Sequence, residues 1–433
     1  MSWSAVADPS AVAEVWLWGQ FVGAVAEMED GRIFFEYSQD HIARGIEISP
    51  LNVPARPGVF AFPELARRPG FNGLPGVLAD ALPDSFGKTV IRTYFTSRGE
   101  MQKALSPVQH LLYVGPRAIG ALEFRPAADL ETRPQDEQAL EIAALVRDAR
   151  RIVEGKADIA VPEIYRIGSS AGGMRPKAVV LHNNGVIRSA FADPRPGDQP
   201  AILKFDGVDP NASPGQMGKP QPFNRVEAAY ARIARNAGLG VVDVRILESD
   251  DGHAHLLIPR FDLGEDGTSL HQHTLGGLLH VDYNDPAASS YEEYLRSALA
   301  LGMSGGALQE AFRRMAFNVL AVNQDDHVKN LSFHLGQNGV WRLSPAYDLT
   351  FARGQGWTRW HQMRVNGKTS GIVLADLLEV AQTFAVKRPR QIVERVADAL
   401  SRWESAAAEC AVPGDATAAI SAALKERREE VFG

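Results

Sequence analysis

The middle of the sequence predicts mainly β-strands, and the part that follows predicts mainly α-helices. This order restricts the number of folds that the chain can adopt. Short runs of apolar and β-branched residues predict strands, at 178–181, 201–205, 244–248 and 255–258. One helix is predicted among them, from Asn224 to about Ala237, with Gly238 at its end. From residue 308 onward, apolar residues recur at helical spacing. The order predicts a small lobe with an antiparallel sheet, followed by a larger and mainly helical lobe.

The first third of the chain predicts a separate β-rich unit. Short aromatic and β-branched runs broken by turn residues predict the strands of a small antiparallel sheet or barrel, at 15–18, 21–25 and 33–37. A helix is expected over 88–97 and a further strand over 121–124. Asp84 precedes this helix, where a helix cap is the expected role and catalysis is the alternative.

A polar stretch from Arg125 to Gln138 contains two prolines and is typical of a linker. We therefore expect three units. Residues 1–130 would form the β-rich N-terminal subdomain, residues 131–263 the small lobe, and residues 264–433 the helical lobe.

Composition indicates how many domains the chain forms, which partners it can bind and in which compartment it folds. A chain of 433 residues is too long for one hydrophobic core. A net charge of -7 argues against a surface that binds nucleic acid unaided. Cys410 is the single cysteine, so an intramolecular disulfide is excluded and a reducing cytosol is expected. No signal peptide or membrane-spanning run is recognised, so we expect a cytoplasmic protein without a membrane partner.

A loop rich in glycine and serine precedes the first strand of the small lobe, at residues 168–177. Its small residues would let backbone N–H groups approach a phosphate, and Arg175 and Lys177 add positive charge. The loop does not match the Walker pattern, so an ordinary turn is the alternative. Lys204 lies inside an otherwise apolar strand, where it either faces water at a sheet edge or reaches the phosphates of ATP.

Glu227 has two possible roles. It stands three residues after Asn224, which is the spacing of a helix capping box. It could equally pair with Lys204, as the glutamate of the corresponding helix does in protein kinases. The sequence leaves both interpretations open.

The series from Asp325 to Asp348 carries the chemistry. A carboxylate, an amide five residues later at Asn330, and a second carboxylate beyond a predicted hairpin suit a phosphotransferase. Asp325 would accept the proton of the attacking hydroxyl, and Asn330 and Asp348 would bind Mg²⁺. A polar helix end is one alternative, and a metal hydrolase site using Asp325, Asp326 and His327 is another.

Three histidines could supply further metal ligands to such a hydrolase. His271, His273 and His280 match no standard zinc spacing. Solvent-exposed or capping roles are expected for them.

Taken in order, these motifs resemble the HipA family of serine/threonine kinases, which act as toxins of bacterial toxin–antitoxin modules. The resemblance covers nearly the whole chain and rests on short segments, at 168–177, 202–205, 224–227, 260–262, 270–272, 325–330 and 344–349, with Val15-Trp16, 82–85 and 119–121 in the first third. It implies an α+β, protein-kinase-like bilobal fold preceded by a β-rich subdomain.

The resemblance also implies residue roles. The catalytic loop would comprise Asp325 as the catalytic aspartate with His327 and Lys329, and Asn330 and Asp348 would be the Mg²⁺ ligands. The residues implied in ATP binding are Lys204, Ser170, Ala171, Gly172, Gly173, Arg260, Phe261 and Asp262. Ser170, or the adjacent Ser169, would be autophosphorylated, which adds negative charge where another phosphate must bind and switches the kinase off.

Two positions depart from the family pattern. Relatives often have Glu where this chain has Pro259, and acidic residues where it has His273 and Thr274. Both departures concern nucleotide binding rather than the catalytic set.

The resemblance implies partners as well. Relatives are held by a small helix-turn-helix antitoxin that binds operator DNA, and known family substrates include aminoacyl-tRNA synthetases. Two other functions remain open: a corepressor that uses the kinase fold as a scaffold for the antitoxin, and a small-molecule or lipid kinase.

Overall fold

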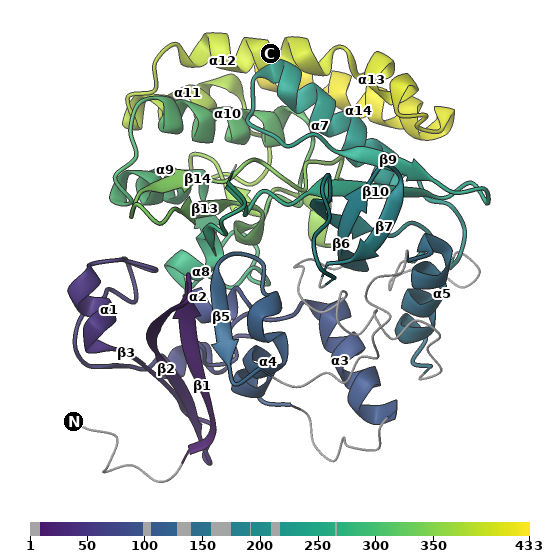
Figure 1. The fold of residues 1–433 in the computed structure, drawn as a ribbon. Coiled ribbons are helices and arrows are strands. Elements are labelled where there is room, and N and C mark those ends of the chain that lie inside the picture. The colour runs from purple at the N-terminus through teal and green to yellow at the C-terminus, as the bar shows by residue number, and fades with distance from the viewer. Residues whose placement is uncertain are drawn as a thin grey trace.

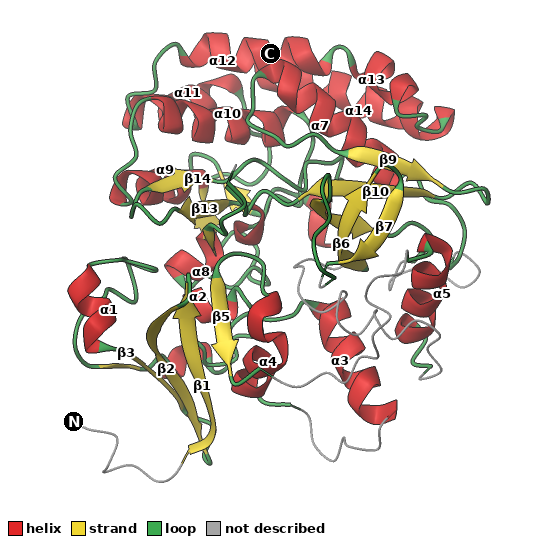
Figure 2. Ribbon diagram, viewed as in Figure 1, coloured by secondary structure: helices red, strands yellow, loops and turns green. Residues whose placement is uncertain are grey.

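The structure is a computed structural model that describes residues 9–97, 105–127, 140–156, 175–190, 192–208, 217–264 and 266–433. The N-terminal sheet is at the lower left of the view, the second sheet is at the right, and the mainly helical region lies across the top (Figure 1). Helices and strands are mixed throughout (Figure 2). The predicted α+β class is confirmed.

The N-terminal sheet has five strands in the order β4-β3-β2-β1-β5, and all of its pairings are antiparallel. The strands are β1 (Pro9–Leu17), β2 (Gln20–Met28), β3 (Ile33–Tyr37), β4 (Val59–Phe60) and β5 (Leu122–Arg125). Leu17 pairs with Gln20, so the β1–β2 turn consists of Trp18 and Gly19. Both have positive φ, at 51° and 71°, which matches the right-handed twist of the hairpin. The predicted hairpins are confirmed, and the alternative of a barrel is not.

Helices cover this sheet and lead away from it. They are α1 (Gln39–Arg44), α2 (Gly76–Ala79), α3 (Ser85–Ser97) and α4 (Pro107–Val114). Asp84 caps α3, because its Oδ1 accepts the backbone N–H of Gly87 at 2.6 Å. The capping role predicted for Asp84 is confirmed.

The second sheet has the order β7-β6-β8-β10-β9 and is also antiparallel throughout. Its strands are β6 (Lys177–Asn183), β7 (Val186–Ser189), β8 (Gln199–Lys204), β9 (Arg245–Glu248) and β10 (Ala254–Pro259). Helix α7 (Phe223–Ala237) packs against β9 and β10 and buries the apolar face that its periodicity predicts. The predicted strands and helix are confirmed, whereas β7 was not predicted.

Helix α3 packs on the second sheet, although it follows the first sheet in the chain. Its Phe86, Val90 and Ile91 share one apolar core with Leu145 and Ile152 of α5 (Ile142–Val153) and with buried residues of β6 and β8. The segment from Ser85 to Ser97 therefore belongs by packing to the small lobe.

The remainder of the chain is mainly helical and contains the largest core. Its principal helices are α8 (Leu275–Leu279), α9 (Tyr291–Ala300), α10 (Gly306–Leu320), α11 (Leu374–Thr383), α12 (Pro389–Leu400), α13 (Trp403–Glu409) and α14 (Gly414–Phe432). A small sheet of β11 (His271–Thr274), β13 (Ser332–Leu335) and β14 (Trp341–Leu343) faces the N-terminal unit. The β13–β14 hairpin is as predicted. None of the helices in the described ranges has both the length and the hydropathy needed to cross a bilayer.

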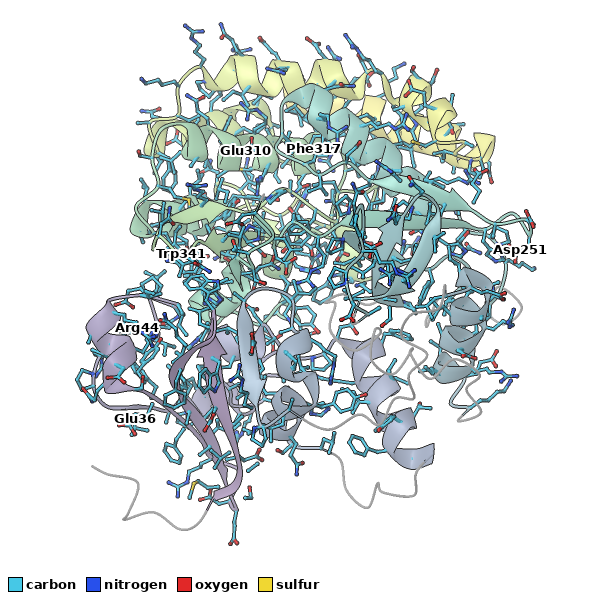
Figure 3. All side chains as sticks on the ribbon, in the orientation of Figure 1. Glu36, Arg44, Asp251, Glu310, Phe317 and Trp341 are labelled. Carbon is cyan, nitrogen blue, oxygen red and sulfur yellow. The ribbon has the colours of Figure 1, made fainter. Side chains whose placement is uncertain are left out.

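Polar groups join the N-terminal unit to this small sheet. His273 Nδ1 donates to Asp80 Oδ2 at 2.7 Å, and its Nε2 lies 3.0 Å from Ser49 Oγ. His271 Nε2 donates to the carbonyl of Ile48 at 2.9 Å. Trp341, which packs on both histidines, lies where the helical lobe meets the N-terminal unit (Figure 3). The expectation that these two histidines are solvated or capping is wrong, because they are buried in this junction.

His280 differs from the other two histidines. It is the left-handed C-cap of α8, with φ 56°, and its Nε2 accepts the backbone N–H of Gly76 at 3.0 Å. The predicted capping role is therefore correct for His280.

Candidate active site

Lys204, the last residue of β8, forms the centre of a buried charge cluster. Its Nζ donates to Glu227 Oε1 at 2.6 Å and also bonds Asp348 Oδ1. Burial alone would lower the pKa of Lys204, but the two carboxylates outweigh it and raise this pKa above the usual value. Lys204 is therefore a charged lysine in the interior and not an edge residue facing water.

The start of α7 decides between the two interpretations of Glu227. The helix begins at Phe223 and its N-cap is Pro222, which makes no side-chain cap. The amide of Asn224 instead donates to the carbonyl of Ala254 at 2.9 Å. The capping box is absent, and Glu227, one helical turn further on, pairs with Lys204.

Lys177 lies directly opposite Lys204 in the register of β6 and β8. It is buried, and its Nζ is 3.7 Å from Asp84 Oδ2. Burial raises the pKa of Asp84 to about 6, with Lys177 opposing the rise. The sequence analysis included Lys177 as a positive charge of the glycine- and serine-rich loop. It did not predict the contact with Asp84, which precedes the linker in the chain.

Asp325 lies in the loop that follows α10. Asn330 donates through Nδ2 to the carbonyl of Asp325 at 3.0 Å, which closes the loop and leaves Asn330 Oδ1 for another partner. Trp357 Nε1 donates to Asp325 Oδ1 at 3.1 Å. Burial is the main reason that the pKa of Asp325 is raised above its ordinary value.

Asp326 is buried and its carboxylate is fully used. It accepts the hydroxyl of Tyr291 at 2.9 Å, Nδ1–H of His361 at 2.9 Å and the backbone N–H of Gln362 at 2.8 Å. No group of three acidic, histidine or cysteine side chains in the described ranges is placed to hold a metal. The hydrolase alternative built on Asp325, Asp326 and His327 therefore finds no support.

His327 and Lys329 both lie next to the ring of Tyr283. The rings of His327 and Tyr283 are 5.6 Å apart, and Lys329 Nζ is 4.9 Å from the centroid of Tyr283. Burial lowers the pKa of His327, and its buried Nδ1 has no hydrogen-bond partner in the described ranges. Both residues therefore belong to the loop that also carries Asp325.

Asp348, which follows the β13–β14 hairpin, also belongs to the cluster through its contact with Lys204. Its φ of 51° is in the left-handed region, a conformation that costs energy for a residue other than glycine. Although burial opposes its ionisation, Lys204 and Lys177 lower the pKa of Asp348 to about 2, so the group is a carboxylate. This carboxylate and Asn330 Oδ1, which has no hydrogen-bond partner among the described residues, are hard oxygen ligands of the kind Mg²⁺ prefers. The donor set fits the ion that the sequence predicts.

Arg260 and Asp262 are engaged with each other. Arg260 donates to both carboxylate oxygens of Asp262, at 3.0 and 2.5 Å, and the backbone N–H of Gly120 donates to Asp262 Oδ2 at 2.7 Å. Their contacts join the N-terminal unit to the end of β10 rather than reaching Lys204. Phe261 between them stacks on Tyr347, with ring centroids 5.3 Å apart, and so lies next to Asp348.

The remaining predicted site residues lie outside the described part of the chain. These are the members of the glycine- and serine-rich loop, namely Ser169, Ser170, Ala171, Gly172 and Gly173.

Comparison with known proteins identifies the family. The HipA-like C-terminal domain model matches residues 169–404, and the HipA N-terminal domain model matches residues 13–125. The chain belongs to the HipA family.

Named relatives and a solved structure agree with this assignment. A putative kinase Y4dM of Sinorhizobium fredii is 24% identical over 404 residues, covering 89% of this chain and 90% of the relative. A putative kinase of Haemophilus influenzae is 28% identical over 162 residues, or 34% of this chain and 47% of the relative. The fold is similar to that of HipA from Shewanella oneidensis MR-1, solved with HipB and operator DNA, with a TM-score of 0.65, 17% identity, and coverage of 96% of this chain and 95% of that one.

Proposed function

We propose that this protein is an ATP- and Mg²⁺-dependent serine/threonine protein kinase that acts as the toxin of a bacterial toxin–antitoxin system. The observation that carries the proposal is the bonding of Lys204 to both Glu227 and Asp348. A strand lysine paired with a helix glutamate, close to an aspartate that can bind Mg²⁺, is the set of groups that protein kinases use for the phosphates of ATP. The kinase names of the two relatives support the same class.

Each polar group would have a defined task. Lys204 would bind the phosphates of ATP, with Glu227 holding its ammonium group in place. Asn330 and Asp348 would hold Mg²⁺, which neutralises charge on the phosphates when bound. Phe261, stacked on Tyr347, would line the nucleotide side.

Asp325 would position the acceptor hydroxyl and receive its proton. Its raised pKa supports this role, because a more basic carboxylate accepts a proton more readily. His327 and Lys329 would complete the catalytic loop.

Regulation and partners follow from family membership. Autophosphorylation of Ser170, or of Ser169, would end the activity. A HipB-like helix-turn-helix antitoxin is the expected partner, and the solved HipA complex with HipB and operator DNA supports this. A component of translation, such as an aminoacyl-tRNA synthetase, is the proposed substrate.

The decisive experiment is phosphoryl transfer from labelled ATP with Mg²⁺. We expect incorporation into the wild-type protein at Ser169 or Ser170, located by mass spectrometry, and none in Asp325→Asn. A wild-type protein that binds MgATP but transfers no phosphate would leave the corepressor as the better reading. Transfer to small molecules alone would favour the small-molecule kinase.

A further inference from the structure

Trp357 makes the one hydrogen bond to the carboxylate of Asp325 that the described residues provide. Its indole N–H donates to Oδ1 at 3.1 Å, while Oδ2 has no hydrogen-bond donor in the described ranges. One oxygen of the carboxylate is thereby fixed and the other is left for an incoming hydroxyl. The indole is therefore placed to orient Asp325 and to border the acceptor.

Hydrogen bonds from the side chain of Gln362 fix the backbone of the loop that carries Trp357. Gln362 Nε2 donates to the carbonyl of Trp357 at 2.6 Å and to that of Trp360 at 2.9 Å. The backbone N–H of Gln362 in turn donates to Asp326 at 2.8 Å. Asp326 thus joins the loop that carries Trp357 to the loop that carries Asp325.

The loop exposes two indoles at this position. Trp357 is 39% and Trp360 40% exposed, whereas most aromatic side chains in the described ranges are less exposed. The guanidinium carbon of Arg359 lies 5.3 Å from the ring centroid of Trp360. Exposed, rigidly held indoles beside a cation are typical of surfaces that bind protein segments.

We propose that Trp357 and Trp360 form the acceptor subsite, which binds the polypeptide segment that carries the phosphorylated hydroxyl. Trp357 acts as a positioning residue for Asp325, and Trp360 with Arg359 takes a neighbouring apolar or acidic side chain of the substrate. The positive charge of Arg359 disfavours a basic side chain there. A polypeptide is the occupant because the two rings lie outside the buried charge cluster and present an open surface. The inference rests on the proposed kinase function.

The test uses the full chain and a peptide library with a fixed central serine and each other position varied. Trp357→Phe removes the N–H and keeps a ring, and Trp360→Ala removes the second ring. Trp16→Phe is the matched control, because Trp16 Nε1 donates to Glu14 at 2.9 Å and Arg125 lies 4.2 Å from its ring, remote from the cluster. MgATP binding is measured for every variant.

We expect Trp357→Phe to lower kcat about tenfold with an unchanged KM for ATP, since an unoriented base loses part of its contribution. Trp360→Ala should raise the peptide KM about fivefold to tenfold and abolish the preference for apolar or acidic neighbours. Trp16→Phe should match the wild type.

Three outcomes would overturn the inference. Equal kinetics and selectivity in all variants would reject the subsite while the proposed kinase function stands. Transfer to the protein's own serines without turnover of any peptide would also reject it. A wild-type protein that transfers phosphate to neither itself nor a peptide would reject the kinase function and the subsite together.

Discussion

Lys177 and Lys204 stand opposite each other on neighbouring antiparallel strands, and both side chains are buried. Residues paired in this way lie on the same face of a sheet, so two positive charges share one interior site. Asp84 compensates Lys177, and Glu227 and Asp348 compensate Lys204. The charge cluster is built from three separate parts of the chain.

Replacement of Lys204 should affect both binding and stability. Lys204→Met leaves the buried Glu227 and the partly exposed Asp348 without their cation, which costs about 3 kcal/mol. We expect a large loss of MgATP affinity by calorimetry and a lower melting temperature. Lys204→Met combined with Glu227→Gln should melt higher than Lys204→Met alone; a further drop would contradict the ion pair.

Replacement of Asp325 should abolish activity without lowering the stability of the fold. Burial disfavours its ionised form, so Asp325→Asn should preserve or raise the melting temperature while transfer falls at least about a hundredfold. A clear loss of thermal stability in Asp325→Asn would show that the carboxylate holds the fold.

Asp326 should behave as a structural residue. Its three hydrogen-bond donors would lose a charged acceptor in Asp326→Ala, at a cost of about 3 kcal/mol or more. We expect a lower melting temperature together with reduced kcat, because the loop of Trp357 is released. Normal stability in Asp326→Ala, measured beside Asp325→Asn, would contradict this role.

Asp84 should make stability depend on pH. Burial raises its pKa to about 6 in the folded protein, from 3.8, so the folded state holds this proton where the unfolded state has lost it. Stability should therefore fall by about 3 kcal/mol as pH rises from 4 to 6 and be constant above that. Asp84→Asn should lack this contribution. If the melting temperatures of the wild type and Asp84→Asn differ by the same amount at every pH from 4 to 7, Asp84 makes no pH-dependent contribution to stability.

Asp262 should hold the N-terminal unit in place. Asp262→Asn weakens the pairing with Arg260 and the bond from Gly120, and we expect a destabilisation of about 3 kcal/mol and faster proteolysis between the units. Asp266→Asn, four residues on at an exposed turn, is the control and should stay within about 0.5 kcal/mol. Equal rates of proteolysis in the two variants would contradict the proposal that Asp262 holds the N-terminal unit against the rest of the protein.

Local patterns in the sequence predicted most elements, because strands and helices are set by periodicity and turn residues. The β13–β14 hairpin and the apolar face of α7 are examples. The Asn224–Glu227 spacing left the role of Glu227 open, because the sequence did not show that α7 begins at Phe223 with Pro222 as its N-cap. Contacts between distant segments, such as Asp84 with Lys177, His273 with Asp80 and Trp357 with Asp325, depend on tertiary packing and have no local signal.

The packing of α3 on the second sheet has a consequence for recombination between related chains. A chimera cut at the linker after residue 127 would combine Phe86, Val90 and Ile91 from one parent with an α5 and sheet from the other. Such a hybrid would mismatch a core and separate Asp84 from the lysine it evolved beside. A crossover before Asp84 would keep Asp84 with Lys177 and the apolar residues of α3 with their core. The part of the chain that should be exchanged with the small lobe therefore begins at Asp84 and not at the linker.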